Sequence, residues 1–374
     1  MSQSFSIVVI CKNEERVIER CIEAIHEDLR EGDEIIVVDT GSTDNTLSIL
    51  ATMENIKIFQ FDWNDDFAEA RNFGISKSSK DWIFFIDSDE ILVKGSIDHL
   101  DDAIKNTLKH ANNRERIVFA PKIINTDDSV LYNAGRILPN DNTVKFEGVI
   151  HEYPIVIEES LNLVSIKISK VVVKHDGYED VVIKNKNKAL RNTTLIEKIL
   201  KQNPNNSRYY YFYYRDAKPM LTDQEYEQGM LNFLKKFPDD SYSNQVAKDL
   251  GFYYLSKNKN DEAEKYITML FESAERGTVE DRSVAIYLTG IKEIQKLKSQ
   301  QKELLRLLIY TRDNVLNQEE SLFENGYAFD DLIGLLFFEL QDYKTAYEIA
   351  HKLNSNNFSS NLSKMLKKLG QIYE

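Results

Sequence analysis

The sequence predicts an α/β domain with a mixed sheet, followed by an all-α domain of helical repeats. Over roughly the first 180 residues, apolar strands alternate with amphipathic polar segments, which is the pattern of βαβ units. After about Val182, glycines and β-branched runs become rare and helical periodicity continues to the end. We therefore expect domains at 1–182 and 207–374, joined by a helical linker at 183–206.

Length and charge limit the classes of protein to consider. The chain has 374 residues, and single cores stop growing near ~250 residues, so we expect two domains. Its apolar runs are too short to cross a bilayer and no export signal precedes the first strand, so we expect a cytoplasmic protein without membrane insertion. The net charge of −14 opposes binding to nucleic acid. Two cysteines are too few for a disulfide framework.

Each element of the first domain follows from a short apolar or amphipathic run. Asn13, with Glu14 and Glu15 behind it, is expected to cap the first helix, because Asn and acidic residues stabilise a helix N-terminus. The third helix is expected at 67–76, and few helix signals follow residue 116, so that stretch should complete an edge of the same sheet. The expected strands are 6–11, 34–39, 56–61, 81–86, 116–124, 144–147 and 164–173.

The second domain contains an internal repeat. Two segments carry apolar or small residues at the same offsets, a set that matches the tetratricopeptide pattern of paired helices. Small residues in them should let helices approach closely, and such an array presents a concave surface that can hold a peptide. The dense aromatic run from Tyr209 to Tyr214 should pack partly against another domain or subunit. The matching residues are Leu250, Gly251, Tyr254, Ala263, Ile267 and Leu270, then Ile333, Gly334, Phe337, Ala346, Ala350 and Leu353.

Acidic residues end the fourth expected strand. Side chains alternate along a strand, so Asp87 and Asp89, on either side of Ser88, can point the same way at the edge where α/β sheets bind ligands. Two carboxylates there repel each other unless a positive charge lies beside them. A divalent ion that carries diphosphate oxygens would meet that need. An acidic turn that caps the next helix is the alternative.

Two other polar residues are expected at the same edge. Asp39 ends the second strand, and its carboxylate could accept an N–H of a base. Arg71, in the helix before the Asp87 strand, could hold Asp87 and approach a nucleotide. A surface pairing of Arg71 with Asp65 or Asp66 is the alternative.

Four ordered segments, at 7–15, 37–46, 68–74 and 85–89, resemble glycosyltransferase family 2, inverting nucleotide-sugar transferases with a GT-A fold. The resemblance covers residues 5 to about 180. It implies that Asp39 and the loop after the first strand hold uracil, and that Asp89 meets a metal-bound diphosphate. We expect the Cys11 thiol itself to be structural, as a small buried hydrophobe. The expected donor site comprises Cys11, Asn13, Glu14, Asp39, Arg71, Asp87, Ser88, Asp89 and Tyr178.

Two later segments would complete the site. Glu152 lies in a stretch that resembles the acceptor-side "HE" segment of a family subgroup and is the candidate catalytic base. The alternatives are that Glu147 is the base or that Glu152 only orients a helix. His175 follows the last apolar strand, where a structural histidine is the alternative to a metal ligand. Similar GT-A enzymes have a metal-binding histidine at this stage of the chain. The resemblance therefore implies that Asp89 and His175 bind Mn²⁺ or Mg²⁺, while Tyr178 could close over the nucleotide.

The domain order is similar to that of the bacteriocin peptide glycosyltransferases of the sublancin S-glycosyltransferase type, which use UDP-glucose and related donors and dimerise. The resemblance implies an in-line displacement, with Glu152 as the base and Asp89 acting through the metal. We expect transfer of a hexose, glucose in the first instance, from a UDP-sugar to Ser or Cys of a peptide such as a glycocin precursor. The alternatives are a glucosyltransferase of lipopolysaccharide core or another cell-surface glycan, and a nonenzymatic repeat scaffold with a nucleotide-sugar binding module.

Overall fold

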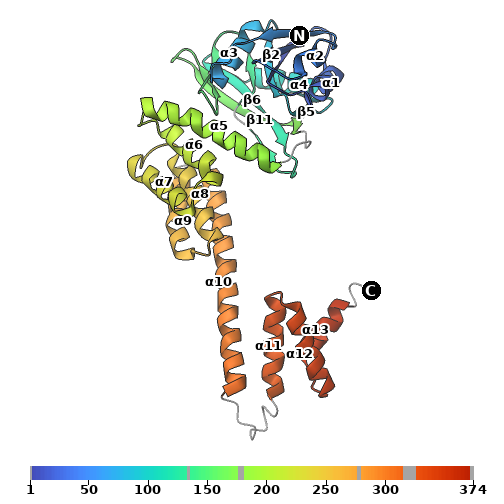
Figure 1. Cartoon of the computed structure of the whole chain (residues 1–374), viewed down its shortest axis with the longest axis vertical. Coiled ribbons are helices and arrows are strands. Elements are labelled where there is room, and N and C mark those ends of the chain that lie inside the picture. Colours follow the sequence, from blue (N-terminus) through green and yellow to red (C-terminus); the bar gives the residue numbers. More distant parts are fainter. Residues whose placement is uncertain (1, 133–134, 176–180, 276–278, 315–325, 371–374) are drawn as a thin grey trace. The chain divides into compact units, whose positions relative to one another are not determined.

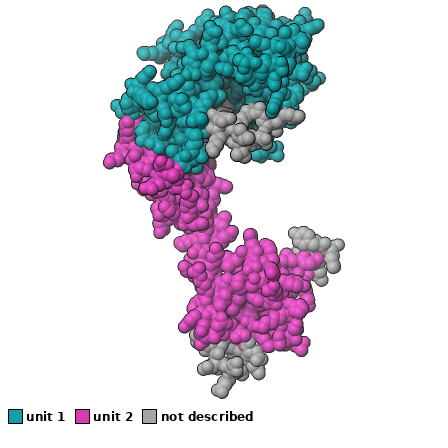
Figure 2. Space-filling view, viewed as in Figure 1, with its two compact units in different colours: residues 1–221 teal, residues 222–374 magenta. Residues whose placement is uncertain are grey.

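The protein divides into two compact units, Met1–Leu221 and Thr222–Glu374 (Figure 2). The structure is a computed structural model. It describes residues 2–132, 135–175, 181–275, 279–314 and 326–370. The first unit contains every strand described, and the described residues of the second are helical apart from their connecting turns. The predicted class, an α/β domain with a mixed sheet followed by an all-α domain, is therefore confirmed.

One large mixed sheet forms the centre of the first unit (Figure 1). Its order is β3-β2-β1-β4-β8-β6-β11-β5, with β7 beside β6. Neighbours among β3, β2, β1 and β4 are parallel, as are β6 and β11, whereas β5, β7 and β8 run antiparallel to their partners. A separate antiparallel pair joins β9 to β10. The strands are β1 (Phe5–Cys11), β2 (Glu34–Asp39), β3 (Ile56–Gln60), β4 (Trp82–Asp87), β5 (Glu90–Leu92), β6 (Glu115–Ile124), β7 (Val130–Leu131), β8 (Ile137–Pro139), β9 (Val144–Glu147), β10 (Tyr153–Val156) and β11 (Asn162–His175).

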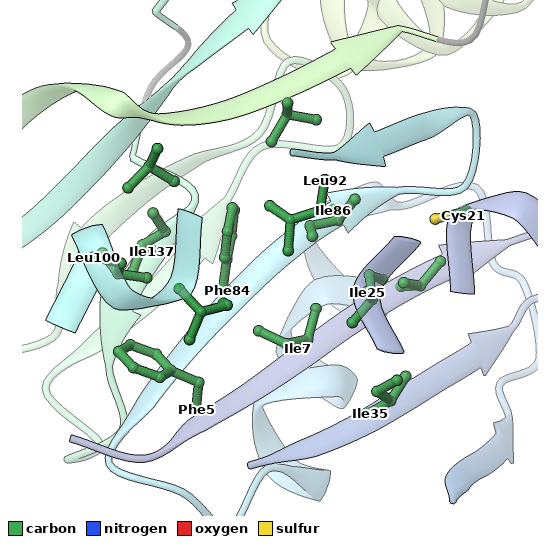
Figure 3. Packing of buried hydrophobic residues seen from close by; sticks show 14 of the residues in the cluster. Phe5, Ile7, Cys21, Ile25, Ile35, Phe84, Ile86, Leu92, Leu100 and Ile137 are labelled. Carbon is green, nitrogen blue, oxygen red and sulfur yellow. The ribbon is translucent and has the colours of Figure 1, made fainter. Parts of the chain in front are cut away.

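Helices cover both faces of this sheet because its central strands are apolar on both sides. Ile7 of β1 packs in one core with Ile25 and Leu100 of two covering helices (Figure 3). Its neighbour Val8 points to the other face and packs with Ala68 and with residues of β9. The helices of this unit are α1 (Ile18–Asp28), α2 (Thr46–Leu50), α3 (Phe67–Lys77), α4 (Ser96–Leu108), α5 (Val181–Gln202), α6 (Ser207–Ala217) and the 3₁₀ turn η1 (Lys218–Met220).

The predicted strands agree with the structure, and their ends differ by a residue or two at most. The predicted cap at Asn13 is wrong. Asn13 adopts a left-handed φ of 58°, and its Oδ1 accepts the backbone N–H of Thr43 at 2.7 Å. It therefore joins the loop after β1 to the loop after β2, and α1 begins later, at Ile18, without a side-chain cap.

Both predicted repeats are helix pairs in the second unit, α8 with α9 and α11 with α12. A Cβ atom on Gly251 of α8 would lie 2.8 Å from Leu288 of α10, and one on Gly334 of α11 would lie 2.4 Å from Leu362 of α13. In both repeats the glycine thus admits the side chain of a third helix. The helices are α7 (Asp223–Lys236), α8 (Ser243–Ser256), α9 (Asn260–Glu275), α10 (Val279–Asn314), α11 (Tyr327–Glu339), α12 (Tyr343–Ser355) and α13 (Asn361–Gly370).

Helix α6 belongs to the first compact unit, whereas the sequence predicts that the repeat domain starts at 207. The hydroxyl of Tyr209 accepts the backbone N–H of Val149 at 2.9 Å, so this aromatic run does pack on the sheet domain. The residue limits of the linker and of the repeat domain otherwise stay a prediction. No helix in the described part of the chain has the length and apolar character that a membrane span requires.

A buried carboxylate joins three segments of the sheet domain. Glu34 accepts hydrogen bonds from Ser6 Oγ at 2.6 Å and from the backbone N–H of Ser79 at 2.7 Å, and it pairs with Lys57 Nζ at 2.6 Å. Burial opposes the charge of Glu34, but these partners lower its pKa from 4.5 to about 2. The ionised side chain therefore stabilises the folded state.

We predict that Glu34→Gln lowers the free energy of unfolding by roughly 2 kcal/mol at pH 7 and by less at pH 3. Because the folded pKa is depressed, the contribution of Glu34 is complete above pH 4.5 and is lost as the pH falls toward 2. Urea unfolding of both proteins at the two pH values measures it. A difference between them that does not change with pH would contradict this role.

Candidate active site

A cleft of about 800 Å³ opens at the carboxyl ends of β1, β2 and β4. Cys11 at the end of β1, Thr40 after β2 and Asp87 at the end of β4 line one side. The other side comes from the loop between β9 and β10 and from helices α5 and α6. All of these elements belong to the first unit. The cleft therefore lies at the edge of the sheet where the sequence predicts a ligand.

The structure brings most of the expected donor residues together at this cleft. Asp39 lies behind the lining, almost fully buried, and its carboxylate accepts the backbone N–H groups of Gly41 and Ser42 at 3.1 Å. Asn13 is occupied with the neighbouring loop and does not line the cleft. Tyr178 falls outside the described residues. The expected donor residues that line the cleft are Cys11, Glu14, Arg71, Asp87, Ser88 and Asp89.

Cys11 has the surroundings of a structural thiol. Its side chain is 2% exposed, and its Sγ lies 3.9 Å from Asp39 Oδ1. Burial raises the pKa of Cys11 far above its ordinary value, and Asp39 raises it further. A thiol that stays protonated is a poor nucleophile, so the contribution of Cys11 is its shape and its backbone carbonyl, which accepts hydrogen bonds from Thr40.

Asp87 lies between two arginines. Its Oδ1 is 3.2 Å from Arg71 Nη2, and its Oδ2 is 2.7 Å from Arg136 Nη2. Burial opposes the charge of Asp87, but Arg136 and then Arg71 lower its pKa below the usual range. The positive charge that this sheet edge requires is thus supplied at Asp87 by the protein itself.

Arg136 also neutralises a second carboxylate, which the sequence did not single out. Its Nη1 lies 2.6 Å from Oε2 of Glu90, whose side chain is fully buried. Burial raises the pKa of Glu90 to about 7, although Arg136 acts in the opposite direction. The backbone carbonyl of Arg136 accepts the N–H of Phe85 at 2.9 Å, which places the arginine beside the end of β4. The sequence offers one signal of this ion pair, which is a single arginine next to an apolar strand. A charged residue in such a place is rarely buried unless it is paired.

Asp89 lines the cleft and lies close to His175, which is not itself part of the lining. β11 runs antiparallel to β5 with His175 opposite Glu90. His175 Nδ1 is 3.9 Å from Asp89 Oδ1, and its Nε2 is 3.8 Å from Glu90 Oε1. The pair could contribute two ligands to one ion. No group of three or more His, Cys, Asp or Glu side chains within the described ranges is arranged to hold a metal, so further ligands would come from substrate or water.

Glu152 enters the cleft from the loop between β9 and β10. Its Oε1 accepts a hydrogen bond from Arg71 Nε at 2.6 Å, and 13% of the side chain is exposed. Burial opposes the charge of Arg71, but Glu152 and then Asp87 raise its pKa above the ordinary value. Arg71 therefore links Glu152 to Asp87. Glu147, the alternative base, does not line the cleft.

The surface pairing considered for Arg71 does not occur. Asp65 instead pairs with Lys198 at 2.6 Å, and Asp66 caps α3 by accepting the backbone N–H of Glu69 at 3.0 Å.

Side chains of helix α6 contact His151, the residue before Glu152, and fix its position. His151 adopts a left-handed φ of 54°, and its ring stacks on Phe212 with centroids 4.2 Å apart. Its Nε2 lies 2.7 Å from Asp216 Oδ2, and its carbonyl accepts a hydrogen bond from Arg208. The conformation of the loop that carries Glu152 is thus fixed by a helix that the sequence assigns to the repeats.

Comparison with known proteins gives matches over both parts of the chain. Residues 6–144 match the family described as Glycosyl transferase family 2. The chain is 26% identical over 364 residues to the SPbeta prophage-derived glycosyltransferase SunS of Bacillus subtilis (strain 168), which covers 96% of this chain and 82% of that protein. A TPR repeat-containing protein of Synechococcus elongatus is 40% identical over 88 residues, 24% of this chain and 21% of that protein. The crystal structure of S. aureus TarS 1-349 aligns with a TM-score of 0.40 at 15% identity, over 74% of this chain and 93% of that one.

Arg136→Met should lower the free energy of unfolding by about 3–5 kcal/mol, because it leaves the buried Glu90 without its positive partner. Adding Glu90→Gln should recover part of this loss, since Glu90 without Arg136 would have to bind a proton to stay buried, whereas the amide is already neutral. Urea unfolding of the single and double variants measures both effects. Arg114→Met, at an exposed arginine outside the cleft, is the matched control and should change stability by less than about 0.5 kcal/mol. Wild-type stability of Arg136→Met would mean that the network does not support the fold.

Proposed function

We propose that this chain, which belongs to glycosyl transferase family 2 as its motifs predict, is an inverting, metal-dependent enzyme. The proposed reaction transfers a hexose from a UDP-sugar to Ser or Cys of a peptide. UDP-glucose is the proposed donor and a glycocin precursor the proposed kind of acceptor. One observation carries the proposal: Asp87 and Asp89 face a cleft that Glu152 enters from another loop, and Arg71 links Glu152 to Asp87. An in-line displacement requires a leaving-group site and a base on opposite sides of the anomeric carbon.

The strand ends form the proposed donor side. Arg71 and Arg136 fix the Asp87 carboxylate, so its position is set before a nucleotide arrives. Asp89 and His175 would hold Mn²⁺ or Mg²⁺, since a carboxylate oxygen and an imidazole nitrogen are both accepted by such ions. The bound ion supplies a Lewis acid that offsets the charge of the departing diphosphate.

Glu152 is the proposed base for the acceptor. An acceptor hydroxyl does not ionise near neutral pH, so a carboxylate at hydrogen-bond distance must take its proton as the new bond forms. The hydrogen bond from Arg71 Nε orients Glu152 and leaves its other oxygen for the acceptor. A Cys acceptor needs less help, because a thiol with a pKa near ~8.5 is partly ionised already.

A peptide acceptor is proposed from the resemblance to bacteriocin peptide glycosyltransferases and from the helix pairs of the second unit, which would hold the peptide. The match to glycosyltransferase SunS spans nearly the whole chain, including those helices. A cytoplasmic location and a homodimer are part of the same proposal. Exposed apolar side chains along α10 offer a surface for such a dimer. They are Ile286, Ile294, Leu297, Leu304 and Leu307.

With UDP-glucose and Mn²⁺, the wild-type protein should add one or two hexose masses to a precursor peptide, as read by intact-mass spectrometry. Asp89→Asn should abolish this transfer and weaken Mn²⁺ binding in the presence of UDP by at least about tenfold, measured by electron paramagnetic resonance. Its unfolding should change little, because the side chain lies in the cleft rather than in the core.

The outcomes separate the alternatives. Wild-type Mn²⁺ affinity in Asp89→Asn would remove the metal from the proposal. A hexose gain on a saccharide or lipid-linked acceptor alone would favour a cell-surface glycan transferase. Absence of UDP-sugar turnover with every common sugar would favour a nonenzymatic scaffold.

Glu152→Gln should reduce kcat for a Ser peptide by about a hundredfold to ten-thousandfold, because the amide cannot take the proton. For the matching Cys peptide at pH 8.5 the loss should be much smaller, since the thiol is then half ionised. Initial rates with the two peptides measure the contrast. Arg71 also binds Glu152, so UDP affinity is measured alongside to exclude a displaced donor site. Equal losses with both acceptors would mean that Glu152 is not the base.

A further inference from the structure

The wall of the cleft formed by α5 and α6 carries positive charge that the proposed mechanism does not use. Arg191 of α5 and Arg208 and Arg215 of α6 all line it. Asp216 lies on the same helix, but it is engaged, with Oδ1 at 2.8 Å from Arg215 and Oδ2 accepting from Asn192 at 2.9 Å. This wall is cationic in a protein whose net charge is −14.

Arg191 is held in place by neutral partners. Its guanidinium lies over the ring of Phe67, 5.0 Å from the centroid, and its Nε and Nη2 donate to Asn192 Oδ1 at 3.3 and 3.1 Å. Asn192 is 4% exposed, and its Nδ2 is fixed by Asp216. Arg191 makes no ion pair with any residue that the structure describes. Its guanidinium therefore lines the cleft without a carboxylate of the described ranges in direct contact with it.

Arg191 lies on the acceptor side of the proposed site. The carboxylates that act on it electrostatically are those of Glu152 and Asp216. Arg208, on the same wall, lies 3.9 Å from the centroid of the Tyr153 ring and donates to the carbonyl of His151. The residues on either side of the proposed base are thus in contact with the cationic wall.

We propose that this wall is an acceptor subsite that binds a carboxylate of the peptide, from an Asp or Glu within a few residues of the Ser or Cys that receives the sugar. The inference rests on the proposed function, because it takes the Glu152 side as the acceptor side. A guanidinium edge binds a carboxylate through paired N–H···O bonds. Asn192 occupies the Nε side of Arg191 and Phe67 covers one face of the guanidinium, so the edge that carries Nη1 would bind the peptide carboxylate. The donor diphosphate is the competing anion, and it is assigned to the Asp89 end of the cleft.

Short synthetic peptides with a single Cys in a Gly and Asn background test this with the full-length protein, UDP-glucose and Mn²⁺. The flanking positions carry Glu, Gln or Lys, and initial rates are read by mass spectrometry. The KM should rise about tenfold from the Glu peptide to the Gln peptide and further to the Lys peptide. Arg191→Gln should bring the three KM values together, and Arg191→Glu should make the Lys peptide the best acceptor.

Arg114→Glu is the matched control, because it makes the same change of charge at an exposed side chain outside the cleft lining and should keep the wild-type order. Calorimetric titration with UDP separates the two anions. A UDP dissociation constant that rises in Arg191→Glu as much as the peptide KM would assign Arg191 to the donor and overturn the subsite. Equal KM values for all three peptides with wild-type protein would overturn it and leave the peptide transferase standing. Hydrolysis of UDP-glucose without transfer to any peptide would overturn both.

Discussion

Arg136 donates hydrogen bonds to Asp87 and to the fully buried Glu90, while Arg71 donates to Asp87 and to Glu152. An ion moved out of water loses several kcal/mol of solvation unless it is paired well, so none of these groups can be buried alone. They come from α3, β4, β5, the residue before β8 and the loop after β9. The network is therefore complete only when the sheet and that loop have reached their final arrangement. Burial of the core and assembly of the cleft are thus coupled.

The neighbouring carboxylates Asp87 and Asp89 have different partners, which gives them different chemistry. Asp87 is neutralised by two guanidinium groups, and it serves as a fixed part of the wall. Asp89, two positions further along the chain, lies at the rim beside His175, where oxygen and nitrogen donors come together. Two carboxylates of the same type, two positions apart, thus contact different partners. On the proposed function, this division separates holding the nucleoside from offsetting the charge of the diphosphate.

The features that the sequence predicts are the local ones. Apolar runs define strands such as β2, and contiguous motifs bring Arg71, Asp87 and Asp89 to one edge because parallel strands end there. Arg136 is an isolated residue whose importance depends on Phe85 and Glu90, far away in the chain, so no local pattern reveals it. The left-handed conformation of Asn13 likewise depends on a loop thirty residues later. Helix α6 has the periodicity of the repeats that follow, so its membership of the sheet domain cannot be read from its spacing.

Because α6 belongs to the sheet domain, the position of the junction matters when two such proteins are joined in a chimera. A chimera joined before Ser207 would exchange the helix that stacks on His151 and would replace one side of the cleft together with the repeats. A junction after Leu221 would leave the cleft intact while the downstream helices were replaced. On the proposed function, domain shuffling at this second junction would change which peptide the downstream helices hold and would leave the site of sugar transfer unchanged.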